Sequence, residues 1–198
     1  MKHEDKVIVT FGEHSMWVPN VLSEGERFSF KGFDWICLDP NAENGNGVLA
    51  IMAETWNGKE YPFDDNGYNN YAKSSLREKL LCDLLPVLGE KNLLPHTVDL
   101  TADNGDDAYG TVTDKVFILS CDEYRKYRKR VPLLEEWMWS CTPWWINQRS
   151  GGGSFVRGVG TTGALSNSHV CISHEVAPAC VFSSKNLKLH RQAQMVEA

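Results

Sequence analysis

The sequence has no long apolar run. Its charged start, residues 1–6, is followed by only three apolar residues before Thr10, and no later stretch approaches the length of a signal peptide or a membrane span. We therefore expect a protein that is not secreted by a signal peptide and does not engage a membrane.

Recognisable catalytic motifs are also missing. The sequence contains no Gly-x-Ser-x-Gly elbow, no His-Glu-x-x-His helix and no Gly-x-x-x-x-Gly-Lys phosphate loop. We expect no catalytic residue and no cofactor, so the protein is predicted not to be an enzyme; an uncharacterised enzyme is the remaining alternative. The six cysteines form no Cys-x-x-Cys pair, which predicts reduced, mostly buried thiols at Cys37, Cys82, Cys121, Cys141, Cys171 and Cys180.

An excess of basic residues is lacking as well. Lys and Arg number 20 against 26 Asp and Glu, a net charge of −6, so the overall field repels phosphate backbones and direct nucleic-acid binding is not expected. Residues 125–130 are the exception, with five basic residues in six. Such a run is typical of a solvated helix face, and binding of an anion or an acidic partner is the alternative.

Apolar material for one folded domain is present, because 42% of the 198 residues are hydrophobic. Residues 7–11 and 28–38 are rich in β-branched and aromatic types, which predicts strands. Asn44-Gly45-Asn46-Gly47 supplies residues that tolerate the positive φ of a tight turn. This segment predicts a β-hairpin over 33–52.

Helical signals follow the hairpin. Ser74-Ser75 caps a series of leucines at helical spacing, which predicts a helix over 74–85 that ends before Pro86. Residues 116–120 are predicted to form a strand, and Asp122-Glu123 to open a short basic helix. From Trp144 onward we expect short strands joined by long loops.

These elements predict an α+β fold with a small mixed or antiparallel sheet and one or two helices. We expect a single domain over 1–198, with N-terminal strands and hairpin (7–52), the helix (74–85) and a loop-rich C-terminal half (114–190).

An ordered series of short segments resembles a bacterial and phage family of unknown function, over roughly residues 20–185. The family motifs are an S-S-L-R helix, a D-K-V-F-L-L-S strand, W-W-L-R-S and V-R-P-A. The matching segments here are Ser74-Ser75-Leu76-Arg77, Asp114 to Ser120, Trp144-Trp145-Ile146 and Val176-Ala177-Pro178-Ala179.

The resemblance implies a C-type-lectin-like fold with a ligand face near the chain end, and recognition in preference to catalysis. Both family arginines have changed, because Asn147 and Ala177 stand in their places. A polar cluster that they form in relatives is therefore absent here, or rebuilt from Arg149 and Arg157.

Metal binding is considered at two places. His169, Cys171 and His174 fall within six residues, but a strand would place His174 on the other face from the first two, and structural zinc needs four ligands. The Asp/Asn-rich segments 64–67 and 103–107 lack the spacing of a calcium loop and favour plain turns, with a loose calcium site as the alternative. We predict no metal site.

Four indoles lie within nine residues, and complete burial of all four would demand several N–H partners inside the core. Trp144 and Trp145 are expected to pack in the core, as the family motif suggests, which leaves Trp137 and Trp139 as the surface candidates. The predicted binding residues are Trp137, Trp139, Asn147, Arg149 and Arg157.

Two classes of binding protein fit this sequence. The first is a recognition protein, phage- or prophage-borne, that engages a protein or a glycan through residues 137–175. The second is a phage-encoded intracellular inhibitor of a bacterial defence system, an acidic, anti-CRISPR-like protein that blocks a basic nuclease. In either case we expect a cytoplasmic protein of the host cytosol or a virion-associated one; the oligomeric state stays open.

Overall fold

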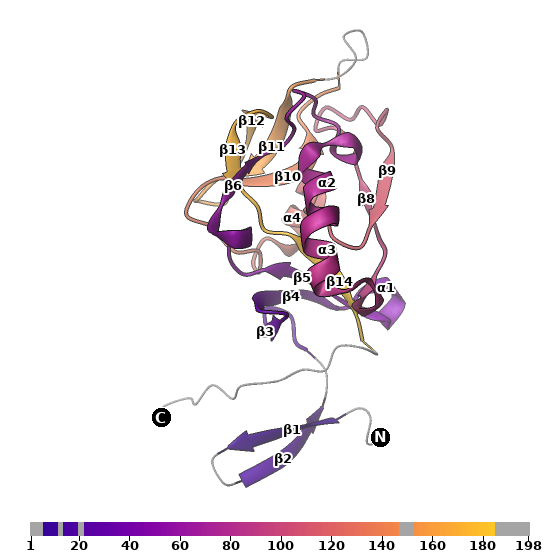
Figure 1. Ribbon diagram of the computed structural model, residues 1–198, viewed down its shortest axis with the longest axis vertical. Coiled ribbons are helices and arrows are strands. Elements are labelled where there is room, and N and C mark those ends of the chain that lie inside the picture. The colour runs from indigo at the N-terminus through magenta and orange to yellow at the C-terminus, as the bar shows by residue number, and fades with distance from the viewer. Residues whose placement is uncertain (1–5, 12–13, 20–21, 147–152, 185–198) are drawn as a thin grey trace.

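The computed structural model of the protein describes residues 6–11, 14–19, 22–146 and 153–184 (Figure 1). The elements of the first half are β1 (Lys6–Phe11), β2 (His14–Pro19), β3 (Arg27–Phe30), β4 (Phe33–Asn41), α1 (Ala42–Gly45), β5 (Gly47–Met52), η2 (Trp56–Gly58), β6 (Glu60–Pro62), η3 (Tyr71–Lys73), α2 (Ser75–Lys79), η4 (Leu80–Leu84), α3 (Leu85–Leu88) and η5 (Glu90–Asn92). Those of the second half are β7 (Leu93–Leu94), β8 (His96–Asp99), β9 (Thr111–Asp114), α4 (Cys121–Tyr127), β10 (Met138–Pro143), β11 (Phe155–Val159), β12 (Leu165–His169), β13 (Ser173–Glu175) and β14 (Ala179–Ser183).

Two five-stranded sheets form most of the fold, with strand orders β12-β11-β10-β13-β6 and β3-β4-β5-β14-β7. The second sheet is antiparallel throughout, whereas β10 and β13 run parallel in the first. Figure 1 shows the first sheet in the upper half and β3, β4 and β5 below it, with the helix of α2, η4 and α3 in front. Two further hairpins, β1–β2 and β8–β9, complete the strands. The architecture is α+β with mixed and antiparallel sheets, as the sequence predicts.

The predicted hairpin over 33–52 is confirmed. β4 and β5 pair antiparallel from Trp35 opposite Met52 to Asp39 opposite Leu49, with one irregularity between. In the turn, Glu43, Asn44 and Gly45 all have positive φ.

The aromatic core of the second sheet gathers around Phe182 of β14. The rings of Trp35, Phe30 and Phe28 meet the Phe182 ring edge-on at 4.9, 5.1 and 5.5 Å. Strands β5 and β14 lie next to each other inside this sheet, and both are buried along their whole length, so the side chains on both faces are covered. Their side chains therefore show no alternation of polar and apolar residues.

The predicted helix begins where expected, since the Ser74 side chain accepts a hydrogen bond from the Arg77 backbone N–H. Its predicted end before Pro86 is wrong, because helical structure continues to Leu88. Residues 80–84 form a π-helical turn in which the Leu85 N–H donates to Leu80 O. This wider turn places Pro86 in the first turn of the next α-helical segment, where a missing N–H costs little.

Arg77 and Asp114 join two of the motif segments quoted above. Arg77 Nε and Nη2 donate to the two carboxylate oxygens of Asp114 at 2.7 and 2.8 Å, and Arg77 Nη1 donates to Ala72 O at 3.0 Å. This bidentate pair fixes the start of α2 against the end of β9.

Residues 116–120 are not a strand, contrary to expectation. Their only ladder contact is the bridge between Phe117 and Ala179, in which each N–H donates to the other carbonyl at 2.7–3.0 Å. The segment is buried from Val116 to Ser120, so burial rather than sheet pairing explains its apolar composition. The helix predicted after it is confirmed as α4, which Ser120 and Glu123 cap reciprocally.

From β11 onward the C-terminal strands are joined by short connections and not by the long loops expected: residues 160–164, 170–172 and 176–178 link β11, β12, β13 and β14 in turn. The connection from β10 to β11, residues 144–154, is long as expected, and its residues 147–152 lie outside the described ranges. The connection at 176–178 crosses from one sheet to the other, with Val176 O accepting from Trp56 N and Pro178 O from Met52 N. Ala177 in this crossing is buried.

Across the described ranges, no helix combines the length and the apolarity that a membrane crossing requires.

Candidate functional site

Among the indoles whose burial the structure describes, Trp144 and Trp145 are the exposed ones, at 41% and 39% accessibility. They directly follow β10, whose six residues are all buried. The expectation that this pair packs in the core is therefore wrong. The sheet ends at Pro143, and the two indoles lie beyond it.

Trp139 is buried, so its assignment to a binding surface is also wrong. It lies on β10, a strand with a neighbour on either side. Its indole N–H donates to Tyr61 O at 2.8 Å, and its ring packs edge-on against Phe63 and His174. The core thus provides the hydrogen-bond partner that a buried indole requires.

Trp137 is half-buried and stacks on the His174 ring with centroids 5.8 Å apart. Its ring lies next to Gly158 of β11 and next to Gly160, which directly follows that strand. A contact between Trp137 and a partner stays a prediction. Asn147 and Arg149, also predicted as binding residues, lie outside the described residues.

Asn69 holds the backbone that carries the two exposed indoles. Its side-chain amide is fully buried and makes four hydrogen bonds: Nδ2 donates to Trp145 O and Phe155 O, both at 2.9 Å, while Oδ1 accepts from Tyr109 Oη at 2.8 Å and from Gly153 N at 3.2 Å. Every donor and acceptor of the amide is used, which fixes its orientation.

Gly153 meets Asn69 at close range. A β-carbon at this position would lie 2.6 Å from both Asn69 Nδ2 and Trp145 O, so only glycine fits without a shift of the backbone. Beside it, Trp144 N donates to Phe155 O at 3.1 Å, and the Trp144 ring packs edge-on against Phe155 at 5.8 Å. Both indoles are therefore anchored through their backbone, and Trp144 also through its ring.

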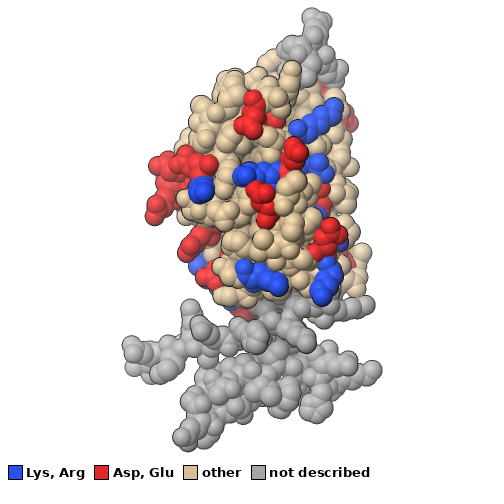
Figure 2. Space-filling view, viewed as in Figure 1, with Lys and Arg blue, Asp and Glu red and all other residues tan. Residues whose placement is uncertain are grey.

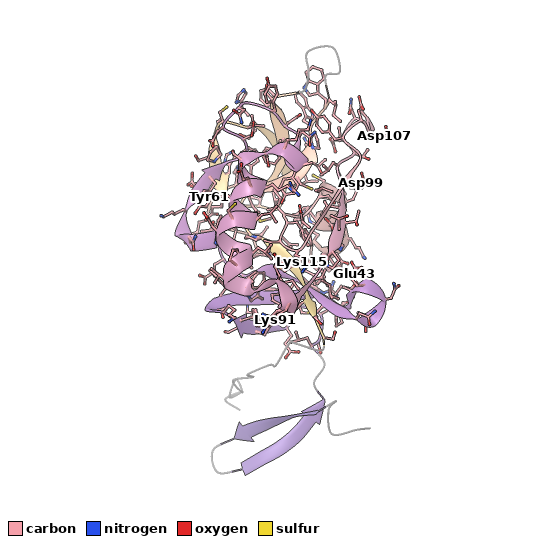
Figure 3. All side chains as sticks on the ribbon, turned by 45° about the vertical axis from the view of Figure 1, so that its right-hand side comes forward. Glu43, Tyr61, Lys91, Asp99, Asp107 and Lys115 are labelled. Atoms are coloured by element: carbon pink, nitrogen blue, oxygen red, sulfur yellow. The ribbon has the colours of Figure 1, made fainter. Side chains whose placement is uncertain are left out.

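A pocket of about 440 Å³ lies against the two indoles and is lined by Asp103, Asn104, Trp144 and Trp145. We call these four residues the tryptophan pocket. The loop between β8 and β9 supplies Asp103 and Asn104, and the Asp103 N–H donates to Pro143 O at 2.9 Å, which ties this loop to the end of β10. Figure 3 shows Asp107 of the same loop at the upper end of the molecule, far above Glu43.

The Asp103 carboxylate is paired with two arginines. Arg125 Nη2 lies 3.3 Å from Oδ1, and Arg157 Nε lies 3.5 Å from Oδ2. Arg125 also pairs with Asp122 at 2.6 Å. Of the predicted site residues, Arg157 is thus the one that the structure brings to the tryptophan pocket, behind its acidic wall.

The basic run 125–130 is engaged by neighbouring side chains. Besides the contacts of Arg125, Lys126 lies over the Tyr127 ring, Arg128 over the Tyr124 ring, and Arg130 pairs with Glu24. Figure 2 shows acidic and basic side chains intermixed on the face that it presents. Arg125 and Lys126 lie on the exposed face of α4, as expected for a solvated helix face, whereas residues 128–130 form a turn after the helix ends.

The side chains of segment 169–174 that could bind a metal ion do not converge on one point. His174 Nε2 pairs with Ser168 Oγ at 2.7 Å, and burial lowers the His174 pKa by more than Glu60 and Glu136 raise it. Cys171 is exposed and its thiol points to Asp64 O at 3.8 Å. Among the described residues, no group of three His, Cys, Asp or Glu side chains could hold a metal ion.

Both Asp/Asn-rich segments are turns, as expected. The buried Asp64 carboxylate accepts from the backbone N–H groups of Asn66, Tyr68 and Ser75 at 2.9–3.1 Å. In the other segment, Asn104 Oδ1 accepts from Asp106 N at 3.3 Å.

All six cysteines are free thiols, and the four buried ones are held protonated. Burial raises the pKa of Cys121, Cys141 and Cys180, and raises that of Cys37 to about 12 with help from Glu26 and Asp39. A thiol nucleophile needs the opposite shift. These four cysteines are therefore structural.

Comparison of the chain with protein-family models, with curated proteins and with solved structures found no match.

Proposed function

We propose that this protein is a non-enzymatic recognition protein that binds a protein or glycan partner through the tryptophan pocket. The observation that carries the proposal is the pair of exposed indoles held in place by a buried, fully bonded Asn69. Exposed tryptophans raise the tendency to aggregate, whereas rigid aromatic side chains are the usual anchors of binding sites. A dedicated support beneath them is what a preorganised binding surface requires.

The resemblance to a bacterial and phage family, and the C-type-lectin-like architecture it implies, belong to the same proposal. They support a binding role at the C-terminal half, in the host cytosol or on a virion. The α+β class and the position of the tryptophan pocket next to the W-W motif agree with that role.

The second candidate is an intracellular inhibitor of a bacterial defence system. The observation that favours it is a group of carboxylates. Asp99, Asp106 and Asp107 belong to β8 or to the loop that borders the tryptophan pocket, and Figure 3 shows Asp99 and Asp107 along one side of the molecule. Together with the net charge of −6, these carboxylates favour a basic partner such as a nuclease groove.

The test uses three forms of the full chain as bait: the wild type, a Trp144→Ala/Trp145→Ala double variant and Val87→Ala. Val87 is 50% exposed, lies on α3, the last part of the helix in front in Figure 1, and serves as the matched exposed apolar control. Each bait is presented to an oligosaccharide array and to a bacterial lysate. We expect ligands that the wild type and Val87→Ala share and that the double variant loses; retention of the same ligands by all three would contradict the proposal.

A further inference from the structure

We propose that the ligand of the tryptophan pocket is a neutral carbohydrate, bound by one or two of its sugar rings. This inference rests on the proposed recognition function and narrows its ligand class.

The residues that line the pocket match both the flat face of a sugar ring and the hydroxyl groups at its edge. Trp144 and Trp145 offer large aromatic surfaces, whose electron-rich faces attract the weakly positive C–H groups on the flat side of a pyranose. Asp103 and Asn104 offer carboxylate and carboxamide groups, which hydrogen-bond hydroxyls at the ring edge. Mostly aromatic walls with a few directional polar groups are the usual composition of a small-ligand site.

The size of the pocket is consistent with this ligand. A volume of about 440 Å³ is within the range of small-molecule sites. It is too small for a folded domain to enter, whereas a chain of sugars can place one unit in it and extend into solvent.

The charge distribution favours a neutral ligand. The carboxylate of Asp103 already faces Arg125 and Arg157, and Arg125 faces Asp122, so two cations and two carboxylates compensate one another. A cationic ligand would have to displace these arginines, and an anionic one would meet the carboxylate at the pocket wall. Hydroxyl groups can use the oxygens of Asp103 without disturbing either pair, because a carboxylate accepts several hydrogen bonds.

The pocket is also preorganised for a weakly interacting ligand. Asn69 and Gly153 fix the backbone of Trp145, and Phe155 fixes that of Trp144. Binding therefore orders little of the backbone that carries the two indoles, which matters most when each contact is modest.

The experiment is affinity electrophoresis of the full chain through native gels that contain hydroxyethylcellulose, xylan or mannan, with dextran sulfate as an anionic control. We expect retardation in at least one neutral gel that persists at about 0.5 M NaCl, since uncharged contacts are not screened. Trp144→Ala and Trp145→Ala should each weaken the retardation about tenfold or more, as truncation of an aromatic anchor does. Val87→Ala should migrate like the wild type.

Asp103→Asn provides a second, independent readout. Removal of the carboxylate leaves Arg125 and Arg157 without their shared partner and makes the pocket cationic. Retardation should weaken in the neutral gel and increase in dextran sulfate. Circular dichroism spectra of all variants establish that they are folded.

The carbohydrate inference is overturned if no neutral polysaccharide retards the protein and no neutral sugar on the oligosaccharide array binds. It is equally overturned if retardation occurs only in dextran sulfate or disappears with salt. In either case, a lysate protein that the wild type captures and the double tryptophan variant does not would leave the recognition function standing. If the protein binds no neutral carbohydrate and captures no lysate protein through the two tryptophans, both the carbohydrate inference and the recognition function are overturned.

Discussion

At the residue scale, the outcome for the indoles shows what local sequence can and cannot predict. Four tryptophans in nine residues correctly indicate that some are exposed, but not which ones. Trp139 is buried because Phe63 and His174 pack against its ring and Tyr61 O accepts its N–H. Both facts depend on residues distant in the sequence. Pro143 is the local signal for the end of the strand, because a proline has no N–H to donate to a sheet ladder, and the two exposed indoles follow it directly.

Asn69 is the residue on which the tryptophan pocket depends most. Its replacement by Ala would leave Trp145 O without this donor and Phe155 O with only the Trp144 N–H, and would leave Gly153 N and Tyr109 Oη without their acceptor. We expect Asn69→Ala to lower the free energy of unfolding by about 2–4 kcal/mol.

The neighbouring Asn70 provides the control, because its side chain only caps the short η3 turn through Ala72 N. Asn70→Ala should cost about 1 kcal/mol. Urea denaturation measures both values. Equal costs for the two variants would show that the Asn69 network does not stabilise the pocket.

His96 makes stability depend on pH. Burial lowers the pKa of His96, but hydrogen bonds to Glu123 at 2.8 Å and Glu43 at 2.9 Å outweigh burial and raise it above its ordinary value. The folded state then binds the proton more tightly than the unfolded chain. The resulting stabilisation is complete below a pH of about 6.5 and is lost as the pH rises through the folded-state pKa.

His174 has the opposite dependence, because burial holds its pKa low. Stability should decrease as the pH falls from about 6.5 toward the folded-state pKa of His174. NMR titration of the two imidazoles measures both shifts, and His96→Gln and His174→Gln should each remove one limb of the stability profile. A lower pKa for His96 than for His174 would refute this assignment.

At the element scale, the elements with local signals were predictable and those that depend on partners were not. The Asn-Gly turn and the serine caps specify the hairpin and the starts of α2 and α4 through their own backbone geometry. The segment 116–120 has the composition of a strand, yet its place in the core leaves it without a ladder. The passage of helical structure through Pro86 depends on a π-helical turn that no single residue indicates.

The junction between α2 and β9 depends on one ion pair. The Asp114 side chain is 4% exposed and the Arg77 side chain is 25% exposed. Loss of the carboxylate would therefore leave a largely buried guanidinium without its charged partner. Asp114→Ala should lower the free energy of unfolding by about 2–3 kcal/mol.

The exposed pair of Lys79 and Asp83 on the same helical segment is the control. Lys79→Ala should change the free energy of unfolding by no more than about 0.5 kcal/mol, because both side chains are solvated. Thermal denaturation of the two variants gives the comparison. A cost for Asp114→Ala as small as that for Lys79→Ala would mean that the bidentate pair contributes little.

At the scale of the whole molecule, the α+β class follows from composition and pattern, but the strand orders do not. Sheet order is set by contacts such as the crossing at 176–178, where a three-residue segment passes from one sheet to the other. The tryptophan pocket likewise depends on contacts between segments that are distant in the sequence. Residue 69, residue 103 and the segment from 144 to 153 are far apart along the chain, and only the fold brings them together.

The central claim is that Trp144 and Trp145 bind a ligand and do not stabilise the fold. The most direct measurement is a titration of the wild type and the Trp144→Ala/Trp145→Ala variant with the best ligand from the array and lysate screens, together with a thermal melt of each. The account predicts that the variant loses binding by at least about two orders of magnitude, while its melting temperature stays within about 2–4 °C, the shift expected for about 1 kcal/mol in a chain of this length. Unchanged binding, or a collapse of stability in the variant, would contradict it.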